Sequence, residues 1–212
     1  DELRFSTAPL YRELNSMASD RAIATVGRAI VGLMKDHCRA DLARGADFEL
    51  YGPQNFDNPM GYGVSLMLYR IAINASPRNR PPRMTATGNK MRPSLPLDLH
   101  YLLTVWASAV DTQHLMLGWA MRFLEDRGVL PAGVLNAYDA EPDTFGAGEG
   151  VELICDPLGL QDYLQIWDKL KTRMPLSVSY VARMVLLDSK LPMSAPAPVR
   201  TRDSSAGEGV VP

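Results

Sequence analysis

Three histidines and two cysteines are the side chains of this sequence best suited to acid-base, nucleophilic or metal chemistry. His100 lies two residues after Asp98, and in a strand both would share one face, where a carboxylate can orient an imidazole for proton transfer. That spacing is more typical of a polar ladder on a strand surface. His37 and Cys38 adjoin a predicted helix end, where the helix dipole favours a histidine, and His114 falls in a first helical turn. We therefore predict no catalytic residues.

Longer signatures of chemistry are absent from the sequence. It contains no CxxC, HExxH, GxSxG, GxGxxG or GxxxxGK[ST] pattern,. The glycine-rich GAGEG at 146–150 lacks the lysine and the strand-to-helix context of a phosphate loop,. Cys38 and Cys155 are too few and too far apart in the chain for a disulfide framework,. We predict no metal site and no cofactor.

Charge is distributed in blocks, although the net charge is only −2. Residues 58–97 contain no acidic side chain, whereas 98–168 are strongly acidic and 169–212 are again basic. Opposite fields on one chain favour head-to-tail association of copies as well as an outside partner. A solvated basic loop is the alternative. The candidate interface residues are Arg70, Arg78, Asn79, Arg80, Arg83, Lys90, Arg92, Arg200 and Arg202.

The basic block does not predict a nucleic-acid interface. The isoelectric point is about 5.9, and no aromatic side chains are interleaved with the basic ones as in nucleic-acid-binding motifs. Direct membrane insertion is not predicted either, because no stretch reaches the roughly 20 apolar residues of a membrane-spanning helix,. The opening DELRFS has no basic region followed by an apolar core, so we expect no signal peptide,.

The length and composition of the chain predict a single domain. It has 212 residues, of which 46% are hydrophobic and 22% charged, as is typical of one globular unit,. Hydrophobic spacing of three to four residues predicts helices and alternation predicts strands. The elements predicted are a helix from an Asp20 N-cap to near Arg44, strands over 64–73 and 95–107, a helix from Asp111 or Thr112 to Arg127, a strand over 151–158, a helix over 159–172 and a strand over 176–187.

Between these elements the composition predicts loops. Residues 51–63 and 74–93 are rich in turn-forming residues, and 131–150 form a loop or a short helix,. The fold class is α/β, a single domain with a sheet of about four strands covered by helices. A helix stripe of Leu115, Leu117, Met121, Phe123 and Leu124 should face this sheet. The predicted sheet core is Leu99, Tyr101, Leu103, Val178, Tyr180, Ala182 and Met184, covered by Trp167.

Three long runs carry a resemblance to a known family: LPLDLHYLLTVWA at 95–107, HLMLGWAMRFLED at 114–126 and LGLQDYLQIWDKLKTRMPLSVSYVARMVLLDS at 158–189. With DRAIATVGRAIVGLM at 20–34 and VSLMLYRIAINASPRNRPP at 64–82, the chain resembles the N-terminal domain of cap, or tail-terminator, proteins of phage-tail-like contractile injection systems. The resemblance covers about residues 17–202. It implies a terminator-like α/β fold.

The resemblance also implies a structural role without catalysis. Copies would form a ring, by analogy a homo-hexamer, that closes the baseplate-distal end of the inner tube and sheath. The partners implied are the chain itself and the sheath and tube proteins. Assembly would take place in the bacterial cytoplasm, and the finished particle would be free or membrane-associated. The alternative, a small soluble α/β enzyme or ligand-binding domain with an unidentified pocket, stays open.

The two ends of the chain lie outside the predicted domain. We expect residues 1–16 to be an N-terminal extension, 17–191 the cap domain and 192–212 a proline-rich C-terminal arm,. Prolines pre-set extended backbone, and the Val199–Arg202 segment has the pattern of a strand,. We hypothesise that this segment adds along a neighbouring subunit or the sheath end; a solvated tail without a role is the alternative.

Overall fold

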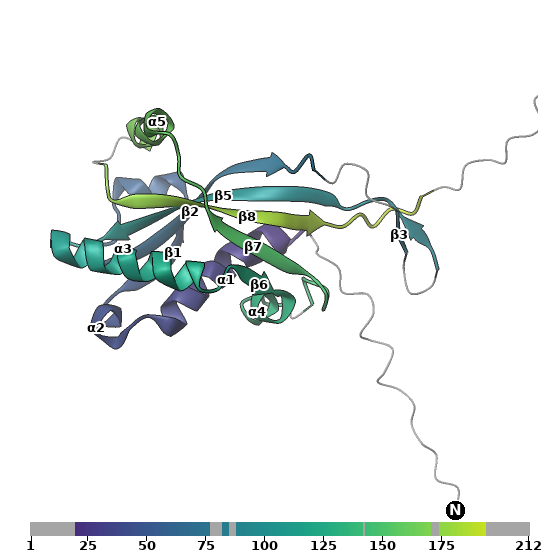
Figure 1. Cartoon of the computed structure of the whole chain (residues 1–212), viewed down its shortest axis with the longest axis horizontal. Coiled ribbons are helices and arrows are strands. Elements are labelled where there is room, and N and C mark those ends of the chain that lie inside the picture. Colours follow the sequence, from purple (N-terminus) through teal and green to yellow (C-terminus); the bar gives the residue numbers. More distant parts are fainter. Residues whose placement is uncertain (1–19, 77–81, 85–87, 142, 171–173, 194–212) are drawn as a thin grey trace, which may run out of the picture.

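A six-stranded sheet organises the computed structural model, which describes residues 20–76, 82–84, 88–141, 143–170 and 174–193. The strand order is β1-β2-β5-β8-β7-β6, with β1 parallel to β2 and the other neighbours antiparallel (Figure 1). The strands are β1 (Asp47–Tyr51), β2 (Gly63–Ile73), β5 (Leu95–Trp106), β6 (Val129–Pro131), β7 (Gly150–Cys155) and β8 (Ser177–Leu187).

The expectation of four strands is therefore wrong by two, and both missed strands are short strands at the edges of the sheet. β1 has five residues and β6 has three, too few for alternation to stand out,. Gly63 lets β1 approach β2: its φ is 142°, and a Cβ atom there would lie 2.0 Å from the carbonyl oxygen of Asp47. Only glycine fits this close contact.

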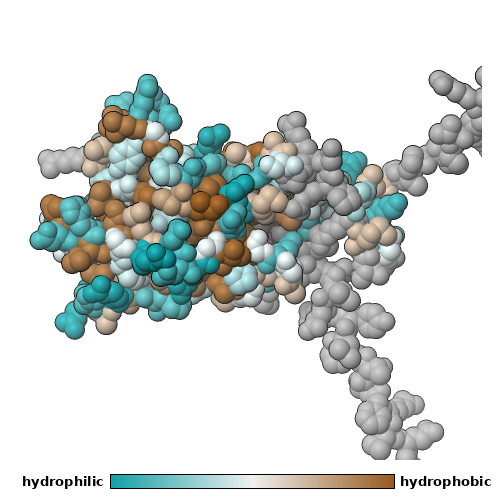
Figure 2. Space-filling model, viewed as in Figure 1, coloured by the Kyte–Doolittle hydropathy of each residue, from teal (hydrophilic) through white to brown (hydrophobic). Residues whose placement is uncertain are grey.

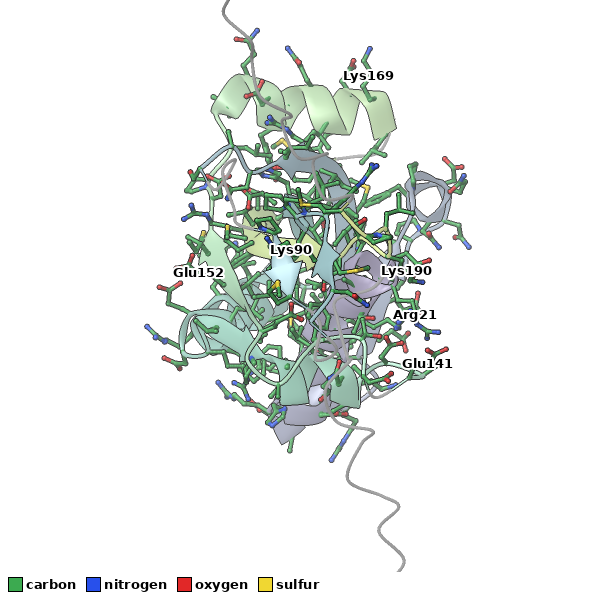
Figure 3. The ribbon with its side chains drawn as sticks, turned by 90° about the vertical axis from the view of Figure 1, so that its right-hand side faces the viewer. Arg21, Lys90, Glu141, Glu152, Lys169 and Lys190 are labelled. Carbon is green, nitrogen blue, oxygen red and sulfur yellow. The ribbon has the colours of Figure 1, made fainter. Side chains whose placement is uncertain are left out.

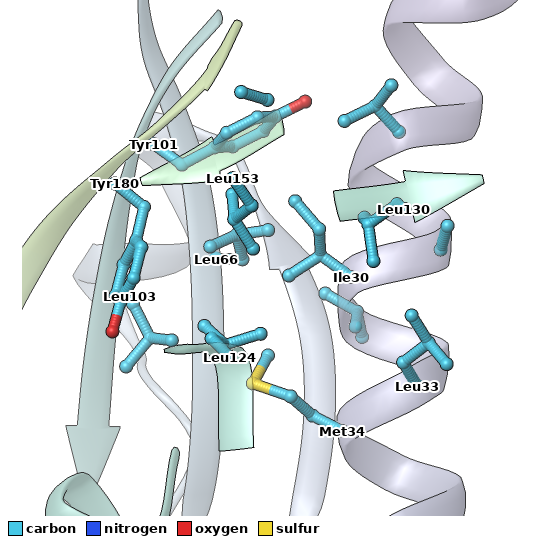
Figure 4. Close-up of a cluster of buried hydrophobic side chains, with 14 of the residues drawn as sticks. Ile30, Leu33, Met34, Leu66, Tyr101, Leu103, Leu124, Leu130, Leu153 and Tyr180 are labelled. Atoms are coloured by element: carbon cyan, nitrogen blue, oxygen red, sulfur yellow. The ribbon is translucent and has the colours of Figure 1, made fainter. Parts of the chain in front are cut away.

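Helices cover both faces of the sheet. On one face lie α1 (Ala22–His37), α3 (Val110–Glu125) and α4 (Ala132–Ala137), whose buried side chains form the main core with the sheet. The opposite face carries α5 (Leu160–Leu170) and the 3-10 helix η1 (Pro53–Asp57) over a smaller cluster. Figure 4 shows the main core, with Ile30, Leu33 and Met34 of α1 facing Tyr101 and Leu103 of β5.

The alternation predicted for β5 is confirmed, because Leu99, Tyr101 and Leu103 are at most 1% exposed. The other face of β5 is also covered, since Leu102 is fully buried. The expected position of Trp167 is wrong: it is buried in the smaller cluster with Leu102, on the far face from the main core.

A bulge in β8 shifts the second half of the predicted core. The β5–β8 register slips between Leu97 and Leu99, and Met184 takes a left-handed conformation with a φ of 63°. An extra residue moves the following side chains to the opposite faces. Val185 is therefore fully buried, whereas Met184 is only partly buried, contrary to its predicted core position. Val178 packs against the main core but is also only partly buried.

The helix boundaries differ from those predicted. α1 begins after Arg21 rather than after an Asp20 cap, and no side chain caps it. It ends at His37, and the separate α2 (Ala40–Ala43) follows. The helix before Gly128 is confirmed, but its buried side chains are Met116, Ala120, Phe123 and Leu124, while Leu115 is 59% exposed.

A network around the carboxylate of Asp139 fixes α1 against the loop that follows α4. The Asp139 side chain is fully buried and accepts hydrogen bonds from Arg21 at 2.8 Å, Arg28 at 2.7 Å and Thr25 at 2.6 Å. Thr144 donates another. Burial raises the pKa of this carboxyl, but the hydrogen bonds outweigh burial and place the pKa below its usual range,.

Candidate assembly interface

One end of the sheet extends beyond the helices and forms a projection, which we define as residues 68–73, 83–84, 90–98 and 184–193. β5 and β8 extend into it toward a second, two-stranded sheet of β3 (Arg83–Met84) and β4 (Lys90–Met91) (Figure 1). The predicted loop 74–93 therefore contains two short strands.

Residues 191–193 tie this small sheet to β8. Pro192 forms a bridge with Met91, the Arg92 amide donates to the carbonyl oxygen of Leu191 at 3.0 Å, and the Met193 amide donates to that of Lys90 at 2.8 Å. The chain after β8 thus pairs as an extended strand with β4.

The projection carries several of the predicted interface residues. Arg70 is exposed on β2, and Lys90 and Arg92 are exposed on and after β4. The fold adds exposed Lys190, which directly precedes the segment 191–193 that pairs with β4; sequence reasoning missed it because this pairing joins distant parts of the chain. Figure 3 looks onto this end of the molecule, with Lys90 near the centre and Lys190 to one side.

The other predicted interface residues are less defined. Arg83 lies in β3, and its side chain is outside the described part of the structure. The positions that lie outside the described residues altogether are Arg78, Asn79, Arg80, Arg200 and Arg202. Of the predicted set, the structure therefore places Arg70, Lys90 and Arg92 as exposed side chains of the projection, and the role of the full set in an interface stays a prediction.

The acidic block does not form one uniform surface. Asp139 is buried in its network, Glu141 accepts a hydrogen bond from Arg21 at 2.6 Å, and Glu152 lies 3.7 Å from Arg183. Glu141 and Glu152 are exposed nonetheless and flank the projection in Figure 3. Internal pairing thus neutralises part of the acidic charge, and the carboxylates of Glu141 and Glu152 stay exposed.

A groove of about 560 Å³ runs between α5 and β2. Its walls are mainly apolar, from Met67, Ile166 and Leu170, and Arg70 and Lys169 are among the residues lining it. Figure 2 shows hydrophobic side chains among hydrophilic ones on α5, at the upper left. The groove lining contains no serine, cysteine or histidine that could act as a nucleophile and base pair,.

Two of the histidines have identified contacts in the structure. His100 lies 3.6 Å from Asp156, not against Asp98, whose carboxylate accepts hydrogen bonds from the Asn74 side chain and the Met184 amide. His37 contacts the carbonyl oxygen of Leu33 at 3.0 Å. Within the described ranges, no group of three or more His, Cys, Asp or Glu side chains is placed to hold a metal ion.

These features define an α/β domain, with helices on both faces of a sheet whose end projects. Residues 25–201 match the family model described as the Pvc16 N-terminal domain, and the chain belongs to this family. No curated protein matches the sequence.

Two solved structures share the fold. One is the sheath/tube terminator of PVC, an extracellular contractile injection system, in its extended state, with 16% identity, a TM-score of 0.59 and coverage of 89% of this chain and 64% of that one. The other is the tube-terminating cap of the anti-feeding prophage, with 16% identity, a TM-score of 0.53 and coverage of 87% and 60%. The chain therefore spans less than two thirds of either relative.

None of the helices in the described residues has the length and apolar character needed to cross a membrane.

Proposed function

We propose that this domain is part of a cap that closes the baseplate-distal end of the tube and sheath of a contractile injection system. The similarity of its fold to a sheath/tube terminator over 89% of the chain carries the proposal. Membership of the Pvc16 N-terminal domain family supports it independently. The function is structural, and no reaction is part of it.

The cap consists of several copies of the chain, arranged as a homo-hexameric ring that contacts tube and sheath. Exposed Lys90 and Arg92 on the projection, and exposed Glu141 and Glu152 elsewhere on the surface, support contacts between unlike charges of neighbouring copies,. A contact between two different surfaces closes into a ring when the rotation between copies suits. Arg70, Arg78, Asn79, Arg80 and Arg83 belong to the same proposed interface.

The three-part organisation of the chain is also proposed. Residues 17–191 form the cap domain, 1–16 an extension and 192–212 an arm for assembly. Pairing of 191–193 with β4 supports an arm that leaves the domain in an extended conformation. Assembly takes place in the bacterial cytoplasm, after which the cap remains part of a free or membrane-associated particle.

Deletion of the gene in a bacterium that produces the particle tests the function. We expect sheaths and tubes of irregular length, seen by electron microscopy, because nothing terminates their growth. Wild-type protein supplied from a plasmid should restore uniform particles. Particles of normal length, closed at both ends, in the deletion strain would contradict the proposal.

The contact surface is tested in the same strain. A variant with Lys90, Arg92 and Lys190 changed to glutamate should leave particles uncapped, whereas a control with Lys35 and Arg44 changed to glutamate should rescue, because these exposed side chains lie on α1 and just after α2. Equal rescue by both variants would contradict the role of the projection.

A further inference from the structure

The outer edge of β2 is unpaired over its second half. β1 pairs with β2 only as far as the Tyr51–Met67 position. Beyond it, β2 pairs with β5 up to Ile73, and no other described strand pairs with its outer side. An unpaired strand edge presents amide and carbonyl groups that can accept another extended segment.

The backbone N–H and C=O groups of Ile71 and Ile73 point toward this unpaired side of β2. The Asn74 amide donates to the carbonyl oxygen of Pro96 at 3.0 Å, and thus points toward β5. In an antiparallel pair, successive residues of a strand point their N–H and C=O groups alternately toward the partner and away from it. Pairing is continuous from Ile71 to Ile73, so the N–H and C=O groups of Ala72 point toward β5 and those of Ile71 and Ile73 point away from it.

Exposed apolar side chains accompany the free amides. Ile71 is 48% exposed and Ile73 is 63% exposed, although their partners on β5, Leu99 and Leu97, are buried. An added strand would cover both isoleucines with its own alternate side chains. Among the described residues, no strand covers the apolar face of the sheet at this position.

The opposite face of the same edge carries both acidic and basic side chains. Asp98 pairs across from Ala72 and accepts hydrogen bonds from the Asn74 side chain and the Met184 amide. Arg70, Asp162 and Lys169 line the groove beside it. A strand with apolar or β-branched side chains on one face and polar ones on the other would complement both faces.

We propose that Val199–Arg202 of a neighbouring copy adds as a strand to the outer edge of β2 at Ile71–Ile73. Val199 and Thr201 would pack beside the two isoleucines, and Arg200 and Arg202 would face the side with mixed charges. The pattern is β-branched at one face and polar at the other, as a strand on this edge requires,.

Ile73 is 63% exposed beside the described residues. The donor is proposed to come from another copy, and pairing within one chain is an outcome of the test below. Residues 194–198 could span up to about 17 Å if extended, starting from Met193, whose amide donates to the carbonyl oxygen of Lys90. This inference rests on the self-association part of the proposed function. It adds a second contact between copies, in which the C-terminal segment of one copy pairs with the β2 edge of another, to the proposed contact between unlike charges.

Truncation and proline variants test it. Light scattering would measure self-association of the full chain, of a truncation after Met193, and of a matched truncation after Arg202 that keeps the donor. We expect the first truncation to weaken association about tenfold, equivalent to roughly 1.4 kcal/mol, and the second to leave it unchanged. Ile73→Pro, which removes one outward N–H, should weaken association similarly, and Ile73→Val should not.

Hydrogen exchange provides a readout that does not depend on the variants folding equally well. The amides of Ile71 and Ile73 should be protected in the full-length oligomer and exchange freely in the dilute monomer and in the truncation after Met193. Protection in the dilute monomer would overturn the inference in favour of pairing within one chain. Protection that appears only when sheath or tube protein is added would overturn it in favour of that partner.

The two proposals fail in different ways. A full chain that stays monomeric at every concentration contradicts self-association itself, and with it the ring. A chain that associates as strongly without residues 194–212 as with them contradicts the strand addition alone.

Discussion

Leu103 is the residue at which the predicted core and the observed core coincide most clearly. It is fully buried in β5. Leu103→Ala should lower the free energy of unfolding by about 2–5 kcal/mol, because the truncated side chain leaves a cavity among packed neighbours. Urea denaturation would measure this. Leu115→Ala, at a 59% exposed position on α3, serves as the control and should change stability by no more than about 0.5 kcal/mol,. Equal losses of stability in the two variants would contradict the assignment of Leu103 to the core.

Asp139 links stability to pH. Its pKa is lower in the folded chain than the usual 3.8, so its contribution is fully present above that value and is lost as the pH falls,. Asp139→Asn should cost about 1–3 kcal/mol near neutral pH, since Arg21 and Thr25 lose a charged acceptor. The difference in the free energy of unfolding between the wild type and Asp139→Asn should become smaller as the pH falls below about 4.

Denaturation curves at several pH values would show this convergence. Asp57→Asn, at an exposed position in η1, is the control and should follow the wild type throughout. A gap between wild type and Asp139→Asn that does not depend on pH would show that the charge of Asp139 is not responsible.

Among the elements, the bulge of β8 against β5 donates a hydrogen bond to one carboxylate partner, Asp98. Asp98 accepts hydrogen bonds from the Asn74 side chain at 3.0 and 3.1 Å and from the Met184 amide at 3.2 Å. Asp98→Ala should cost about 1–3 kcal/mol, because these donors lose their acceptor. Hydrogen exchange should become faster in 184–187 and stay unchanged in α1. Asp162→Ala on the exposed face of α5 is the control; equal acceleration in that variant would contradict the role of Asp98.

The same bulge shows how far the sequence determined the elements. Alternation in β5 predicted the burial of Leu99, Tyr101 and Leu103 correctly, because one regular strand keeps its faces throughout,. Alternation in β8 predicted Met184 inside, and Val185 is buried instead, because no local pattern marks an inserted residue,. Trp167 belongs to an amphipathic helix, but helix periodicity does not indicate which face of a sheet the helix will cover.

The candidate interface was predicted in part for a similar reason. The absence of acidic residues between 58 and 97 is local information, and it made Lys90 and Arg92 candidates, which the structure places exposed on the projection. Lys190 joins them through pairing between segments about one hundred residues apart, which no local pattern encodes,. Arg78, Asn79, Arg80, Arg200 and Arg202 remain predictions, since they lie outside the described residues.

For the whole molecule, the charge blocks predict that association depends on salt. Exposed charges are screened beyond about 8–10 Å at physiological ionic strength. Raising the salt concentration should therefore weaken self-association, as should changing Arg78, Arg80 and Arg83 together to glutamate. Analytical ultracentrifugation would measure both effects. Indifference of association to salt and to the triple reversal would refute a charge-driven contact.

The pairing of β5 with β8 bears on how the chain folds as it is synthesised. Leu95 pairs with Leu187 and Thr104 with Ser177, so the central strand finds its second neighbour only after most of the chain has been made. Such distant contacts slow folding and leave hydrophobic strand edges exposed to aggregation in the meantime. Nascent chains that end before β8 should consequently be targets of chaperones, and a chain split between β7 and β8 should recover its native state only when both pieces are present.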